Sequence, residues 1–297
     1  MFPAAVLASV EKEVNQPLHR YFDLIVGTST GGIVALGLGM GIAASDILSM
    51  YKRWGPTIFR EPSILRRLGI WRQKYDQAPL KKALVEVFGA RRLGESQTRL
   101  VIPSLNLDNG EVHIFKTAHN ERFSTDMKEQ CVNVALATSA APTFFAPYVS
   151  EDGIPLVDGG VYATNPTAIG VVEAIGVLGW SRTEILVLSL GCTTEVFDAG
   201  KARGRNPGLL HWIPALVGLT TTAQSSISHG MAVHLLSYGQ ITRVSPYVPA
   251  GRYRLDRLDS YDSLAGLAAS EARRMMPLLK ERFFDTKAPL FFPEHQL

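Results

Sequence analysis

Apolar and polar positions follow two different periods along this chain, and each period predicts its own kind of element. Helical spacing runs through residues 3–14, a continuous apolar run at 22–26 predicts a short buried strand, and helical spacing returns at 31–40. The same criteria predict helices over 78–88, 130–138, 165–178, 211–238 and 260–284, and strands over 99–107, 112–117, 155–158 and 184–190. This alternation predicts an α/β fold with a mostly parallel central sheet flanked by helices, in three layers (α/β/α).

The organisation of the chain is simple. No linker, internal repeat or low-complexity tract divides the 297 residues, so we expect a single domain over 1–297. Within it, residues from about 193 to 297 are expected to be mainly helical. The turn at 108–110, Asp-Asn-Gly between two predicted strands, has the chemistry of a hairpin.

Net charge, cysteine content and the length of the apolar runs indicate which partners and which cell compartment to expect. A net charge of +3 is far from the dense basic surface of a nucleic-acid-binding protein, so we expect no DNA or RNA partner. Cys131 and Cys192 form no disulfide or metal-binding pattern, which favours reduced thiols in the cytoplasm. No apolar run is long enough to cross a bilayer, and no signal-peptide pattern is present, so we expect no membrane anchor.

The turn between the first predicted strand and the next helix, Gly-Thr-Ser-Thr-Gly-Gly at 27–32, has two chemical interpretations. A phosphate-binding loop needs a lysine after its glycines, but the first lysine after this turn is Lys52, and the glycines at 37–41 follow a helix instead of a strand. The alternative is G-x-S-x-G on a strand–turn–helix, the context of a nucleophile elbow with Ser29 at its centre. Gly27 and Gly31 then allow close packing, and the N–H of Thr30 points to the position of an oxyanion. A plain tight turn is the competing explanation.

A nucleophilic serine needs a base, and the sequence offers two kinds. His211, His229 and His234 all fall in predicted helices, where packing or surface roles explain them better. Asp158 ends a predicted strand and precedes Gly159 and Gly160, so it would reach the carboxyl edge of the sheet, where ligands bind in such folds. A buried aspartate with a raised pKa can act as a base directly. A turn residue that bonds its own backbone remains the alternative.

Three motifs together resemble the patatin-like phospholipase family. They are YFDLIVGTSTGGIVALGLG from Tyr21, ALATSAAPTFFAP from Ala135 and LVDGGVYATNP from Leu156, in the family's order and spacing. The resemblance implies a patatin-like fold and a catalytic pair without histidine, formed by the serine of GxSxG and the aspartate of DG[GA]. These residues are Ser29 and Asp158, with Gly27, Thr30, Gly31 and Gly32 at the elbow and Gly159 and Gly160 after the acid.

The resemblance also implies the reaction. Ser29 would attack an ester carbonyl of a membrane phospholipid while Asp158 takes its proton, and water would then release the fatty acid from an acyl-serine intermediate. The expected activity is that of a phospholipase A or lipid acyl hydrolase, without metal or cofactor. The protein would contact the membrane peripherally when active.

The printed sequence departs from the family at one place. Family members carry a glycine-rich DGGGxRG loop on a first strand, shortly before a helix like residues 2–14, and its N–H groups form the oxyanion hole. The sequence starts at Met1 without this loop or strand, which would leave a gap in the sheet. Two interpretations follow: a longer, active natural protein, or a catalytically impaired module that binds lipid or nucleotide.

Two segments are candidates for regulation and membrane contact. The stretch HIFKTAHNERF, from His113, is similar to antiphage effectors that are activated by a cyclic dinucleotide, and Lys116, His119, Arg122, Arg203 or Arg205 would contact that anion; solvated charge explains these residues equally well. The segment 54–71 mixes large apolar and basic residues, so it is either an interfacial segment or an ordinary cap over the core. The sequence leaves the oligomeric state open.

Overall fold

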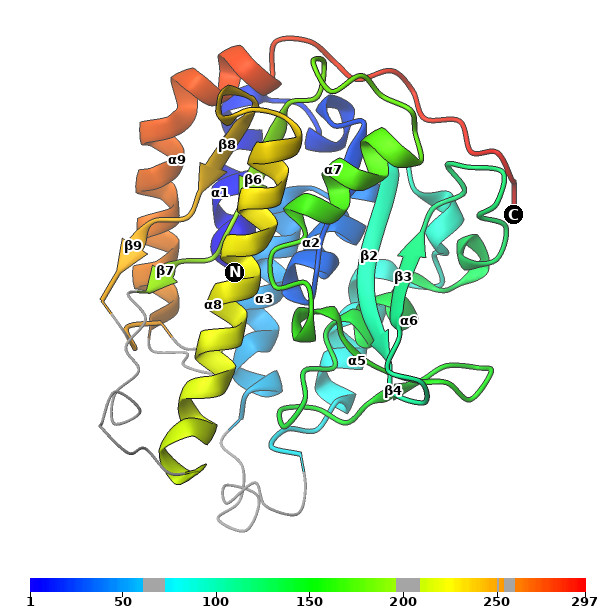
Figure 1. The fold of residues 1–297 in the computed structure, drawn as a ribbon, viewed down its shortest axis with the longest axis vertical. Helices are drawn as coiled ribbons and strands as arrows, with labels where there is room; N and C mark the ends of the chain where they lie inside the picture. Colours follow the sequence, from blue (N-terminus) through cyan, green and yellow to red (C-terminus); the bar gives the residue numbers. More distant parts are fainter. Residues whose placement is uncertain (61–72, 196–208, 250, 254–259) are drawn as a thin grey trace.

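The computed structural model describes residues 1–60, 73–195, 209–249, 251–253 and 260–297 (Figure 1). The helices are α1 (Phe2–Val14), α2 (Thr30–Gly39), α3 (Ala44–Ile58), α5 (Ala78–Phe88), α6 (Cys131–Thr138), α7 (Thr167–Gly176), α8 (Leu209–Leu235) and α9 (Tyr261–Phe283). The strands are β1 (Leu24–Val26), β2 (Arg99–Asn106), β3 (Val112–Lys116), β4 (Tyr148–Val149), β5 (Pro155–Asp158), β6 (Val187–Leu190), β7 (Thr194–Glu195), β8 (Ile241–Val244) and β9 (Tyr247–Val248).

The five-stranded sheet is mixed, which differs from the expected mostly parallel sheet. β1 is parallel to β2, whereas β3 and β5 both run antiparallel to β2 and β4 runs antiparallel to β5. β3 runs antiparallel to β2 because the tight turn at 108–110, where Gly110 has φ 72°, joins the two strands as a hairpin. Parallel pairing is confined to β1–β2 and to the two-stranded pairs β6–β8 and β7–β9 among the described strands.

β1 and β5 share one edge of β2, and this arrangement positions the site. β3 pairs with residues 101–105 of β2, so β1, at residues 99–101, and β5, at 104–106, must both lie on the opposite edge. β1 runs parallel to β2 and β5 runs antiparallel, so the two strands approach each other head to head. Their carboxyl ends meet beside Pro103, which has no N–H to donate to either strand.

Helices cover both faces of the sheet, which confirms the three-layer arrangement. Gly32 of α2 packs against Ile102 on one face, and Gly170 of α7 packs against Val26 on the other. Side chains alternate between the faces along a strand, so the pairing of Val26 with Val101 places α2 and α7 on opposite sides. α2 itself is buried from Gly32 to Gly39, as expected of a helix that is apolar all round.

β1 leaves one edge open. Among the described strands β1 pairs with β2 alone, and a cavity of about 500 Å³ lies beside it, lined by β1, α7, β6 and residues 281–286.

The C-terminal part is less purely helical than expected. α8 and α9 account for most of it, but β8 and β9 pair in parallel with β6 and β7 and were not predicted. In the part of the chain that the structure describes, no helix combines the length and the apolar character needed to cross a bilayer.

Candidate active site

Ser29 lies in the turn between β1 and α2, in a backbone conformation that favours glycine. Its φ is 58° and its ψ is −128°, and it precedes the first residue of α2. Gly27 makes the tight approach feasible, because a Cβ there would lie only 2.2 Å from the carbonyl oxygen of Gly31. The same expectation for Gly31 is wrong, because a Cβ at that residue would meet nothing within 4 Å. The strand, strained serine and helix are therefore arranged as a nucleophile elbow.

The structure brings Ser29 and Asp158 together. The Ser29 hydroxyl donates to Oδ2 of Asp158 at 2.5 Å, and the two residues are separated by 129 positions in the sequence. The expected contact therefore exists, but for a different topological reason. The sequence argument assumed that parallel strands deliver both residues to one edge, whereas β5 runs antiparallel and meets β1 head to head along β2.

Asp158 is nearly buried, and this burial sets its chemistry. Its exposed fraction is 5%, and burial raises the pKa of its carboxyl from 3.8 to about 6, a rise that is limited by hydrogen bonds from the Ser29 hydroxyl and the Gly160 N–H. The Gly160 N–H donates to Oδ1 at 2.7 Å, so each carboxylate oxygen has a donor. Gly159 is required for packing, since a Cβ there would lie 2.4 Å from the carbonyl oxygen of Pro103.

Thr138 connects the elbow to the central strand, and the sequence analysis did not single it out. Its fully buried hydroxyl accepts the N–H of Ser29 at 3.0 Å and donates to the carbonyl oxygen of Pro103 at 2.6 Å. Its methyl group packs against Gly32. The sequence feature that could have identified Thr138 is its position in the motif ALATSAAPTFFAP, at the end of α6.

The N–H of Thr30 is available as a donor next to Ser29. Thr30 begins α2, and among the described residues its N–H has no hydrogen-bond partner, whereas the N–H groups of Gly31 and Gly32 donate to the carbonyls of Thr28 and Ser29. The N-terminus of α2 adds a partial positive charge at this point. Tyr51 of α3 donates to the carbonyl oxygen of Thr30 at 2.8 Å, a contact that the sequence pattern did not predict.

Neither of the two histidines considered as bases whose side chains the structure describes bonds the Ser29 hydroxyl. The ring of His229 packs edge-on against Tyr238, and His234 is exposed near the end of α8. The side chain of His211 lies outside the described residues. In the described part of the chain, Asp158 is the hydrogen-bond partner of the Ser29 hydroxyl.

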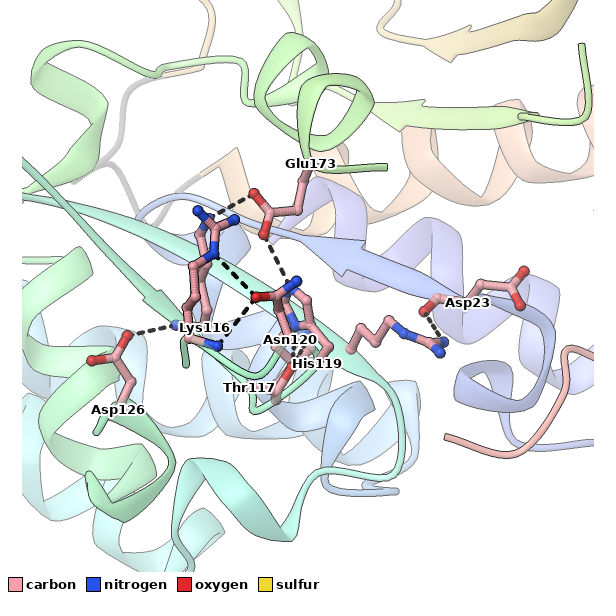
Figure 2. A network of polar contacts seen from close by, with 10 residues as sticks. Asp23, Lys116, Thr117, His119, Asn120, Asp126 and Glu173 are labelled. Carbon is pink, nitrogen blue, oxygen red and sulfur yellow. Dashed lines mark hydrogen bonds and ion pairs between the residues drawn. The ribbon is translucent and has the colours of Figure 1, made fainter. Parts of the chain in front are cut away.

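A second polar cluster joins β3 to α7, and it contains two of the expected anion-binding residues (Figure 2). Glu173 of α7 accepts from Nζ of Lys116 at 2.7 Å and from Nε2 of His119 at 2.9 Å, and Thr117 bonds Nδ1 of the same ring. Burial favours a raised pKa for Glu173, but these hydrogen bonds outweigh it and hold the pKa below its ordinary value. Lys116 and His119 are thus engaged internally.

The other candidates are less constrained. Arg122 is exposed and its Nε donates to Asn120, while Arg203 and Arg205 lie outside the described residues. The first part of the 54–71 segment is a cap over the core: Ile58 is buried, and the ring of Phe59 lies 5.3 Å from that of Tyr75. Residues 61–72 lie outside the described part.

Comparisons with known proteins point to a single family. A family model described as patatin-like phospholipase matches residues 1–171. The chain is 35% identical over 233 residues to a cGAMP-activated phospholipase of Pseudomonas aeruginosa (strain BWHPSA011 / Pa011), which covers 77% of this chain and 70% of that protein. It is 33% identical over 297 residues to one of Escherichia coli (strain TW11681), which covers 91% of this chain and 83% of that protein.

A third relative matches over a shorter range. A cGAMP-activated phospholipase of Vibrio cholerae (serotype O1) is 35% identical over 190 residues, 58% of this chain and 54% of that protein. The family model covers more than half of the chain, and it includes both the elbow and the strand that ends at Asp158. The chain therefore belongs to the patatin-like phospholipase family.

Proposed function

We propose that this protein is a serine lipid acyl hydrolase that cleaves ester-linked fatty acids from membrane phospholipids, with Ser29 as nucleophile and Asp158 as base. The observation that carries the proposal is the 2.5 Å hydrogen bond between a strained elbow serine and a nearly buried carboxylate whose pKa is about 6. At neutral pH such a carboxylate is ionised and can accept the serine proton. Membership of the family supplies the class of substrate.

The reaction would proceed in two steps. The Ser29 oxygen attacks the ester carbonyl, its proton passes to Asp158, and the alcohol of the lysophospholipid takes that proton as it leaves. Water then gives a proton to Asp158 and attacks the acyl-serine, and the fatty acid leaves as Ser29 recovers its proton. The N–H of Thr30 and the start of α2 would stabilise the oxyanion; one such donor typically contributes about a hundred- to a thousandfold in rate.

The first test is fatty-acid release from phospholipid vesicles. Ser29→Ala and Asp158→Ala are each expected to reduce release by at least about a thousandfold. Ser49→Ala and Asp152→Ala, at exposed positions away from the site, are matched controls that should keep the parent rate. Each protein is also assayed with DGGGxRG fused before Met1.

A serine-reactive fluorophosphonate probe separates an enzyme from a binding module. The probe should label the parent protein but not Ser29→Ala. If neither the parent nor the fused form is labelled or releases fatty acid, the hydrolase proposal fails. The alternative, a lipid- or nucleotide-binding module, then takes its place.

We also propose that a cyclic dinucleotide activates the enzyme, which would make it an antiviral effector. The support is the names of the three bacterial relatives, each called cGAMP-activated. Because Lys116 and His119 are engaged by Glu173, the exposed Arg122 is the better anion contact within the described part of this stretch. Adding cGAMP should increase fatty-acid release several-fold; an unchanged rate across micromolar concentrations contradicts activation by this ligand.

A further inference from the structure

α8 has an unusual composition for an exposed helix. Its 27 residues, Leu209–Leu235, include no aspartate, glutamate, lysine or arginine. Large apolar side chains nonetheless face solvent along its N-terminal half: Trp212 is 38% exposed, Leu216 43%, Val217 69% and Leu219 39%. These four residues are called the apolar α8 surface below.

This half of α8 extends past the neighbouring described helices. Consecutive residues of a helix point about 100° apart, and Leu216, Val217, Leu219 and Thr220 are all exposed, so more than one side of the helix faces outward. Figure 1 shows the first turns of α8 extending beyond the ends of α3 and α9. In the C-terminal half Ala232 is fully buried, although Ile227 and Met231 on the same half are exposed (60% and 52%).

Two of the three threonine hydroxyls on the projecting half, those of Thr220 and Thr221, are bonded within the helix. Thr220 donates to the carbonyl oxygen of Leu216 at 2.8 Å, and Thr221 donates to that of Val217 at 2.9 Å. Moving an unpaired hydroxyl from water into an apolar phase is costly, whereas an internally bonded one loses little. This half of the helix therefore carries no charge and few unpaired side-chain hydroxyls to desolvate.

α8 is fastened to the segment that follows Asp158. Nε2 of Gln224 donates to the carbonyl oxygen of Val161 at 2.8 Å, and Nδ2 of Asn165 donates to that of Ser225 at 3.2 Å. Val161 lies three residues after Asp158 and is itself 44% exposed. The apolar α8 surface thus leads to the loop that holds the proposed base.

We infer that the apolar α8 surface docks on the phospholipid bilayer and brings the active site to its substrate. The inference deepens the proposed function and rests on it, because a lipid hydrolase must meet its substrate at an interface. A second copy of the chain is the competing occupant, and the mass measurement below tests it. The bilayer is favoured because the proposed substrate lies there, and because a helix end without charged side chains, with two threonine hydroxyls bonded within the helix, loses little on entering an apolar phase.

Binding is measured by flotation with phosphatidylcholine vesicles, in the full chain carrying Ser29→Ala so that the vesicles stay intact. Leu216→Ser combined with Val217→Ser is expected to weaken binding at least tenfold. The matched control is Leu278→Ser combined with Val172→Ser, which replaces the same residue types, also exposed on helices (40% and 53%), and should bind like its parent. Equal binding by both double variants overturns the inference.

Activity and mass distinguish the remaining outcomes. With Ser29 restored, the α8 variant should lose vesicle hydrolysis in proportion to binding but hydrolyse a soluble short-chain ester at the parent rate. If the parent is a dimer that the α8 variant dissociates, a second copy covers the surface and the inference fails. If binding depends on α8 but the parent hydrolyses neither substrate, the docking surface stands and the proposed function fails.

Discussion

Ser29 is held in a backbone conformation that costs free energy for any residue except glycine. A non-glycine residue in such a region is destabilised by roughly 1–3 kcal/mol, which the surrounding contacts must offset. Ser29→Gly and Ser29→Ala both remove the hydroxyl, but only glycine relieves the backbone. We expect Ser29→Gly to be more stable than Ser29→Ala by about 1–2 kcal/mol in urea unfolding at pH 7. The usual order at unstrained sites, alanine above glycine, would contradict the strain.

Asp158 makes the activity depend on pH in a definite direction. Burial raises its pKa from 3.8 to about 6, and in the proposed mechanism the ionised form acts as the base. The kcat/KM for a soluble ester should therefore rise about tenfold per pH unit below pH 6 and level off near pH 7. A profile that is flat between pH 5 and pH 8 would exclude Asp158 as the titrating base.

The raised pKa of Asp158 should increase activity as pH rises, but it should lower the stability of the folded protein over the same pH range. The raised pKa means that the folded state disfavours the carboxylate, so Asp158 costs stability above its unfolded pKa, by about 3 kcal/mol once pH exceeds 6. Asp158→Asn should accordingly be inactive yet more stable than the parent at pH 8, with a gain about half as large at pH 5. Urea midpoints at the two pH values test this; a destabilised variant at pH 8 would contradict it.

At the scale of elements, the elbow depends on the end of α6. Thr138→Val removes the hydroxyl that bridges Ser29 and Pro103, leaving a buried N–H and a carbonyl without this partner at a cost of roughly 1–3 kcal/mol. We expect kcat for a soluble ester to fall at least tenfold with little change in KM. Thr138→Ser keeps the hydroxyl and should restore most of kcat; equal losses in both variants would indicate packing alone.

The positions of the helices and strands were largely predictable from the sequence, but the direction in which each strand runs in the sheet was not. Continuous apolar runs placed β1 and β5 closely, and helical spacing placed α2, α5 and α6, because each of these elements turns apolar side chains toward the core in a regular pattern. The direction of β5 depends on pairing with β2, which no local pattern records. β8 was missed since its four residues, Ile241–Val244, include the polar Thr242 and Arg243 and follow a long helix.

Within the candidate site, the pair Ser29 and Asp158 was predictable from sequence motifs. Thr138 and Tyr51 were not, because they act through contacts that only the fold creates.

At the scale of the whole molecule, Glu173 ties the β2–β3 hairpin to the helix layer on the α7 face. Glu173→Gln would leave Lys116 and His119 without their carboxylate, and we expect a loss of about 3 kcal/mol at pH 7. Because the folded pKa of Glu173 lies below its ordinary value of 4.5, this stability is present above 4.5 and is lost as pH falls through the folded pKa.

Urea midpoints at pH 7 and pH 4 measure this effect. The difference between the parent and Glu173→Gln should be smaller at pH 4. Glu86→Gln is the control, since Glu86 and Arg53 form an exposed ion pair whose loss should cost less than about 1 kcal/mol. Similar losses in the two variants would show that the buried cluster is no stronger than a surface pair.

The head-to-head meeting of β1 and β5 also has a consequence during protein synthesis. Ser29 leaves the ribosome 129 residues before Asp158, an interval on the order of ten seconds at typical elongation rates. Until β5 pairs with β2, Ser29 lacks its hydrogen bond to Asp158, so under the proposed mechanism a growing or prematurely ended chain would not attack lipid. The topology would thus keep the proposed activity silent in the nascent chain until the sequence has been made beyond residue 158.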